Sequence, residues 1–363
     1  MRLPTPLALE TSFNLAGAGE SLEDALVSCI GECVERLSQV ERAGDITRNL
    51  SCAEAAPDTM SAARHLIQEV LHCSTQDSRT TPAWIHGRTL GTGRACLIPA
   101  DWCLRRQIAG PLVIPGGALS TGCAAGESVE AAATRSLLEL IERDAASLWW
   151  IGGYRPRPVA ADSRTMAEAT RVLGNLRRNS RERTSWLLDI TSDLDVPCVA
   201  AVSVDQKGRG LACGLAARLS LSEAARAAIF EMCQMELAFQ IAQIKRHQRG
   251  DAALNEIDRR HLARATEIDA ESCELLHPLG SPRREREAAD AGEPLSALQA
   301  VVVRCGLEAA LVDLTRPEFG IPVVWAMAPE LQLMPCNLQT ERLRRAIATT
   351  GGGERVTRGV ALF

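Results

Sequence analysis

The chain has 363 residues, of which 46% are hydrophobic and 23% are charged, and its formal net charge is −5. This composition is that of a folded globular protein and excludes extended disorder. The mildly acidic balance lacks the basic surface that nucleic acid or an anionic membrane would require.

Thirteen cysteines are scattered along the chain without Cys-x2-Cys or Cys/His spacing. We therefore predict free thiols rather than a disulfide framework or a zinc site. The N-terminus has no apolar stretch like that of a signal peptide, and no run approaches the length of a membrane span. The expected location is the cytoplasm, with no membrane and no nucleic acid as partner.

A repeated segment organises the chain. Residues 17–36 and 124–143 are identical at nine of 20 positions without a gap, and a weaker third copy begins at Ser220. Each copy follows a serine typical of a helix N-cap, and the second helix is expected to continue to about Trp150. The first helix should present one apolar face, formed by Leu22, Ala25, Leu26, Cys29, Ile30, Cys33 and Leu37.

Strand pairs alternate with these helices. Residues 84–98 predict two strands separated by glycines, and residues 187–202 and 311–327 each read as a strand, a turn after Asp-x-Thr and a second strand. Between them, residues 158–185 predict a polar, Arg-rich stretch with an amphipathic helix. The charged stretch at 246–294 predicts a solvated helix and linker on the periphery.

This order of elements predicts an α+β fold, with helices packed on antiparallel or mixed sheets, rather than a strict βαβ rhythm. We expect a single domain over residues 1–363, with a core from about 14 to 330 and a C-terminal tail at 331–363.

The helices of the repeat carry acidic side chains three residues apart, on one helical face. The acid pairs are Glu32 with Glu35 and Glu139 with Glu142, and in the third copy Glu231 is followed at the same spacing by Gln234. In the first copy these acids lie opposite the apolar face, which is also typical of a solvated surface helix.

The second copy favours a buried site instead, because apolar residues surround Glu139 and Glu142 on that helix. Buried carboxylates need a cation, and without His or Cys ligands they suit Mg2+ better than zinc. Arg36 and Arg143 follow the acids and suit phosphate oxygens.

Residues 120–145, which read STGCAAGESVE and then LLELIERDA, resemble the signature of the YcaO family. Ser28-x3-Glu32-x2-Glu35-Arg36 is similar to the first nucleotide motif of that family, and the stretch with Glu231 and Gln234 is similar to the third. The two Asp-x-Thr strand turns resemble those of the family as well, so the resemblance runs from about residue 14 to 330.

The resemblance implies an α+β fold with an ATP site that has no P-loop, and ATP-dependent phosphorylation of a peptide-bond oxygen. It assigns ATP and Mg2+ binding to matched positions, with the five glutamates as metal ligands: Glu32, Glu35, Glu139, Glu142 and Glu231. The other nucleotide contacts that it implies are Ser28, Arg36, Glu127, Arg143, Arg226 and Gln234. It identifies no general base.

Three activities are compatible with the resemblance, and the first of them is the leading hypothesis. These are cyclodehydration of Cys, Ser or Thr to azolines, thioamide formation with external sulfide, and a non-catalytic scaffold role. Ala131 and Ala227 stand where the family often has charged residues, Glu127 replaces a frequent Asn, and Arg226 is next to the usual arginine position.

The expected partners are a precursor peptide and a separate protein, either leader-binding and E1-like or sulfur-delivering. A flavin-dependent dehydrogenase and a homodimer are compatible with the family. The chain itself shows no leader-binding region, and the proline-rich tail of many azoline-forming members is missing.

Overall fold

The computed structural model describes residues 15–73, 81–107, 110–117, 119–284 and 293–362, which form two compact units. The first unit contains residues up to Leu137 and most of 298–338, and the second contains residues from Leu138 to Ala297 and the C-terminal part. The prediction of one domain over 1–363 stays a prediction. Its core was expected from residue 14, which lies outside the described residues, as do 285–292 of the predicted linker.

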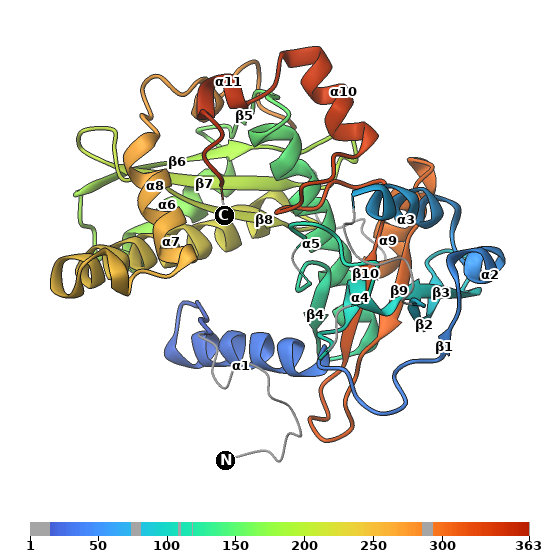
Figure 1. The fold of residues 1–363 in the computed structure, drawn as a ribbon. Coiled ribbons are helices and arrows are strands. Elements are labelled where there is room, and N and C mark those ends of the chain that lie inside the picture. The colour runs from blue at the N-terminus through green and yellow to red at the C-terminus, as the bar shows by residue number, and fades with distance from the viewer. Residues whose placement is uncertain (1–14, 74–80, 108–109, 118, 285–292, 363) are drawn as a thin grey trace. The chain divides into compact units, whose positions relative to one another are not determined.

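The first unit is built on a sheet of six strands, in the order β1-β2-β9-β10-β4 with β3 paired to β2 (Figure 1). Its strands are β1 Arg48–Asn49, β2 Ala83–Thr89, β3 Ala95–Pro99, β4 Cys123–Ala125, β9 Ala310–Asp313 and β10 Val323–Met327. Its helices are α1 Leu22–Ser38, α2 Cys52–Ala55, η1 Ala56–Asp58, α3 Ser61–Cys73 and α4 Ala100–Cys103. Neighbouring strands are antiparallel, and a core of apolar residues from the sheet and from α3 and α4 holds them together.

The second unit is built on a four-stranded antiparallel sheet in the order β5-β6-β7-β8, with α6 and α7 against one face (Figure 1). Its strands are β5 Arg157–Pro158, β6 Arg183–Asp189, β7 Cys198–Asp205 and β8 Ala212–Ala217. Its helices are α6 Arg164–Leu176, α7 Leu221–Arg249, η2 Asp251–Ala253, α8 Glu256–Glu267, η3 Glu274–Leu276, α10 Glu341–Thr350 and α11 Glu354–Thr357. Two helices, α5 Val129–Trp150 and α9 Pro294–Arg304, run across the division between the units.

The α+β expectation and the predicted strand pairs are confirmed by these sheets. The pair β2–β3 corresponds to the segment 84–98, β6–β7 to 187–202, and β9–β10 to 311–327. The N-caps at Ser21 and Ser220 are confirmed as well, since each hydroxyl accepts a backbone N–H of its first helical turn.

The apolar face predicted for α1 is not buried as a whole. Leu22, Leu26 and Ile30 are 87%, 56% and 46% exposed, whereas Val34 near the other end of the helix is buried. The contacts of α1 within the first unit are with β4 and β10, and the end of the helix is fixed there, as described below. The helical period predicts which residues share a face, but it does not say how far along the helix that face is covered.

The predicted solvated helix within 246–294 is also only partly correct. The helix exists as α8, but it buries Leu262, Arg264 and Ala265, and Leu262 packs with Ala242 and Phe239 of α7. The charged sequence did not indicate this burial, because the buried face itself includes Asp258 and Arg264.

Within the part of the chain that is described, no helix has both the length and the apolar character needed to cross a bilayer.

Candidate functional site

The end of α1 is anchored by a buried arginine from the turn between β9 and β10. The Arg316 guanidinium donates to the carbonyl oxygens of Ser38, at 2.7 Å, and of Val40, at 3.1 Å, and pairs with Asp45 at 2.7 Å. A cation at this position also interacts favourably with the negative end of the helix dipole. Arg316 therefore holds the part of α1 that carries the first acid pair.

Glu35 is held by an edge strand of the six-stranded sheet. Its carboxylate accepts the backbone N–H of Ala125 in β4 at 2.7 Å. Burial raises the pKa of Glu35 to about 7, against the lowering effect of that hydrogen bond, and the neighbouring Glu32 raises it further. Glu32 itself accepts the N–H of Ala16 and pairs with Arg36 at 3.2 Å.

The second unit repeats this arrangement on a different edge strand. Glu231 of α7 accepts the N–H of Leu215 at 2.8 Å, and Glu142 of α5 accepts the N–H of Ala217 at 3.2 Å. Both donors lie in β8, the last strand of its sheet. An edge strand has unpaired backbone N–H groups, so in both units these acids satisfy donors that would otherwise lack a partner.

Arg143 lies among three acids of the second unit. Its guanidinium is 3.6 Å from Glu139 and 3.6 Å from Glu142. Burial disfavours its charge, but Glu142, Glu139 and Glu231 together raise the pKa of Arg143. Burial raises the pKa of Glu142, which is only 8% exposed, and it raises that of Glu231 to about 7, where the charge of Glu142 adds to the effect.

The next residue on α5 belongs to a second anchor, which was not predicted from the sequence. Asp144 is fully buried, accepts the N–H of Gln332, and pairs with Arg342 of α10 at 2.8 Å. Arg342 also pairs with Asp193. Asp144 belongs to the Glu-Arg-Asp sequence that was recognised as part of a motif. Its partner, Arg342, lies 198 residues away in the chain, and no local pattern indicates the pair.

The predicted residues thus form two groups. Glu32, Glu35 and Arg36 are neighbours in the first unit, and Glu139, Glu142, Arg143 and Glu231 are neighbours in the second. Gln234 is half-buried, one turn after Glu231. The remaining candidates are exposed, namely Ser28, Glu127 and Arg226, and the Arg226 guanidinium lies 5.8 Å from the centre of the Phe230 ring.

Two further arginines contact these groups without having been predicted. Arg135 donates to the carbonyl oxygen of Ala125 and lowers the pKa of Glu35 by its charge. Arg218, directly after β8, donates to the carbonyl oxygen of Ala217 and lowers the pKa of Glu142 by its charge. Arg135 lies four residues before Glu139, so the helical period could have placed it on the same face.

Across the described ranges, no three or more His, Cys, Asp or Glu side chains are grouped so that they could hold a metal ion. The chemistry of the acids nevertheless fits Mg2+. They offer hard oxygen ligands, and burial disfavours their ionisation unless a cation offsets the charge.

Glycine at position 214 in β8 allows α7 to pack closely enough for Glu231 to reach Leu215. A Cβ at this position would lie 2.1 Å from the backbone N of Met232 and 2.3 Å from the carbonyl oxygen of Ala228. Gly214→Ala should therefore displace α7 and cost about 1–3 kcal/mol of unfolding free energy. Denaturant unfolding measures this cost.

Gly31→Ala is the matched control, because nothing lies within 4 Å of a Cβ placed there, inside α1. This control should be neutral or stabilising by up to about 1 kcal/mol, the helix propensity difference. Equal effects of the two substitutions would contradict the close packing of α7 on β8.

The sequence profile described as "YcaO cyclodehydratase, ATP- and Mg2+-binding" matches residues 16–332. The chain belongs to the YcaO family. The resemblance found in the motifs is thereby confirmed, and the expected cofactors, ATP and Mg2+, are those in the description of the family.

Solved structures share the fold of this YcaO chain. A heterocyclase in complex with substrate and cofactor superposes with a TM-score of 0.68 at 22% identity, over 87% of this chain and 44% of that one. The heterocyclase TruD gives 0.68 at 19% identity, over 90% and 48%. YcaO from Methanopyrus kandleri, bound with AMPPCP and Mg2+, gives 0.58 at 22% identity, over 88% and 79%.

The chain spans less than half the length of the two heterocyclases. No curated protein sequence matches the chain. The assignment of individual residues to the ATP site remains a prediction.

Proposed function

We propose that this YcaO chain uses ATP to activate backbone amides of a ribosomally made precursor peptide, closing Cys, Ser or Thr side chains into azolines. The side chain attacks the amide carbon, and the amide oxygen then takes the γ-phosphoryl group of ATP. Phosphate leaves with that oxygen, so each ring yields ADP, phosphate and one azoline. Such a reaction depends mainly on electrostatic placement of the phosphates.

The observation that carries the proposal is the set of buried carboxylates in a chain of this family. Glu35 and Glu231 have pKa values of about 7, and Glu142 is almost fully buried beside Arg143. Acids in such surroundings are costly in a protein that does not use them. Mg2+, when bound, would offset both their charge and that of the nucleotide phosphates.

In this proposal the residues matched to the family motifs bind the nucleotide and its metal ions. The metal ligands are Glu32, Glu35, Glu139, Glu142 and Glu231. Arg36 and Arg143 bind phosphate oxygens and limit repulsion between the acids, with which they are paired. Ser28, Glu127, Arg226 and Gln234 supply further nucleotide contacts.

The edge-strand amides have a positioning role. Each donates to one carboxylate oxygen, so the acid is oriented before the nucleotide arrives. In Glu142 the second oxygen lies 3.6 Å from the Arg143 guanidinium. A precursor peptide and a partner protein complete the system that we propose.

The direct test combines the purified chain with ATP, Mg2+, a candidate Cys- or Ser-rich precursor peptide and its partner protein, and measures product mass. The expected result is a loss of one water per modified residue together with release of phosphate. Replacement of oxygen by sulfur would instead identify a thioamide-forming enzyme. No consumption of ATP with any such combination would overturn the proposal in favour of a scaffold role.

A further inference from the structure

A cavity of about 520 Å3 lies entirely within the first unit, and none of the predicted nucleotide residues lines it. Three segments form its walls: η1 with the start of α3, the turn between β2 and β3, and the end of α9 with the residues that lead to β9. Its volume is within the range of small-ligand sites and exceeds that of a single side chain.

The floor of this cavity is apolar. Met60, Leu90, Cys96 and Val302 line it and are each at least nine-tenths buried. Val303 extends the apolar surface to the rim, where it is 66% exposed. An apolar floor that opens to water favours an apolar side chain as its occupant.

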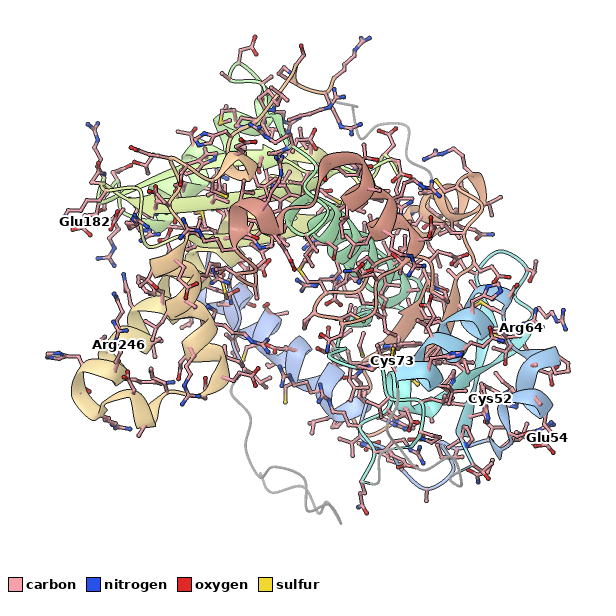
Figure 2. The ribbon with its side chains drawn as sticks, turned by 45° about the horizontal axis from the view of Figure 1, so that its top comes forward. Cys52, Glu54, Arg64, Cys73, Glu182 and Arg246 are labelled. Carbon is pink, nitrogen blue, oxygen red and sulfur yellow. The ribbon has the colours of Figure 1, made fainter. Side chains whose placement is uncertain are left out.

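The rim of the cavity carries charged side chains. Arg64 extends from α3 to the surface (Figure 2), and Arg94 lies in the turn between β2 and β3. Arg94 has no ion-pair partner among the described residues. Glu308 accepts the N–H of Ala62 at 2.6 Å, so its negative charge stabilises the N-terminus of α3.

These features exclude a nucleotide as the natural occupant. No aromatic side chain lines the described cavity, so a base would have no ring to stack on. Phosphates would also approach the carboxylates of Asp58 and Glu308. A peptide segment fits better, because it combines an apolar side chain with N–H groups for Asp58 and a carboxylate for Arg94 and Arg64.

We propose that this cavity binds a short segment of the substrate peptide, with an apolar side chain on the floor and an adjacent carboxylate on Arg94 and Arg64. The inference rests on the proposed function for the choice of a peptide, and it concerns recognition rather than chemistry. The cavity would hold the peptide as a recognition subsite, since no predicted nucleotide residue lines it.

The test uses the full chain, without ATP or Mg2+, and acetyl-Leu-Glu-Leu-amide as the probe. Methyl NMR should show shifts at Met60, Leu90 and Val302 with a dissociation constant on the order of 1 mM, as for a weak contact. Arg94→Ala should weaken binding about tenfold, the usual loss for one charge-assisted contact. Thr92→Trp, at the mouth of the cavity, should abolish the shifts.

The matched control is Arg88→Ala, in the same hairpin but outside the cavity lining, which should bind like the wild type. The probe acetyl-Ser-Glu-Ser-amide should cause no shifts. Absence of shifts at these methyl groups with the leucine probe, or shifts that persist in Thr92→Trp, would overturn the inference. Binding of the partner protein in this cavity, without binding of the leucine probe, would overturn the inference too.

These outcomes are independent of catalysis. A chain that consumes no ATP but binds the probe in the cavity would contradict the proposed function and leave the peptide subsite standing. A chain that consumes ATP but does not bind the probe in the cavity would support the proposed function and overturn the peptide subsite.

Discussion

Glu142→Gln should lower ATP consumption at least about a hundredfold, the loss that follows removal of one well-placed charge from a phosphoryl-transfer site. The substitution keeps the size of the side chain and an oxygen that can still accept the N–H of Ala217. It removes the negative charge that lies 3.6 Å from Arg143 and that we assign to Mg2+. Phosphate release, measured with and without peptide, gives the rate.

Folding is not expected to limit this variant. Burial raises the pKa of Glu142, so the ionised carboxylate is unfavourable in the folded chain without a cation, and the amide should not lower the melting temperature. Glu223→Gln, in the exposed first turn of α7, is the matched control and should retain full activity. Wild-type rates in Glu142→Gln would show that this acid is not part of the ATP site.

Binding of Mg2+ and nucleotide should become steeply tighter as pH rises towards 8. Glu35 and Glu231 have pKa values of about 7, raised by burial from 4.5, and must lose their protons before they can bind a cation. Affinity should therefore fall about tenfold per pH unit below 7 for each acid that is required. Calorimetric titration of a non-hydrolysable ATP analogue with Mg2+ across this pH range measures the slope.

The stability of the metal-free chain should have the opposite dependence. A raised pKa means that the folded chain holds its proton to higher pH than the unfolded chain. This contribution to stability is complete below about pH 4.5 and is lost as pH rises through about 7. Melting temperatures should thus fall over that interval without Mg2+. Glu35→Gln and Glu231→Gln should each flatten both curves, and a pH profile unchanged by either substitution would contradict the titration assigned to these acids.

The elements could be predicted from the sequence where local physical rules decide them. The serine at position 21 begins α1 because its side chain accepts the N–H of Asp24, which in turn binds the backbone of Ser21. An apolar run, a polar turn and a second run with β-branched residues formed β6 with β7 and β9 with β10. These features depend on residues close together in the chain.

The hydrogen bonds that orient the acids could not be predicted in the same way. Glu35 and Ala125 are 90 residues apart, and Glu142 and Ala217 are 75 apart. Each bond depends on which strand lies at the edge of its sheet, and no local pattern gives that order. The motif positions of the glutamates, of Arg36 and of Arg143 were identified in the sequence, whereas the edge-strand amides, Arg135 and Arg218, which also lower the pKa values of these acids, were not.

Coverage of a helix face was the other feature that escaped sequence reasoning. The apolar residues of α1 have the expected period, yet Leu22 and Leu26 are exposed. Conversely, the charged sequence of α8 hid a buried arginine, Arg264, which donates to the carbonyl oxygen of Leu362. Whether a helix face is buried depends on which other elements pack against it. The apolar period of a single helix gives no information on that packing.

The central claim is that the buried acids of α5 and α7 bind a metal ion together with its nucleotide, and a double-mutant cycle tests it most directly. Mn2+ in place of Mg2+, with a non-hydrolysable ATP analogue, allows binding to be followed by electron paramagnetic resonance in Glu142→Gln, Glu231→Gln and the double variant. If the acids share one metal–nucleotide site, each single substitution should remove most nucleotide-dependent binding, and the double variant should be little worse. Additive losses, or a single variant that binds nucleotide and metal like the wild type, would contradict the claim.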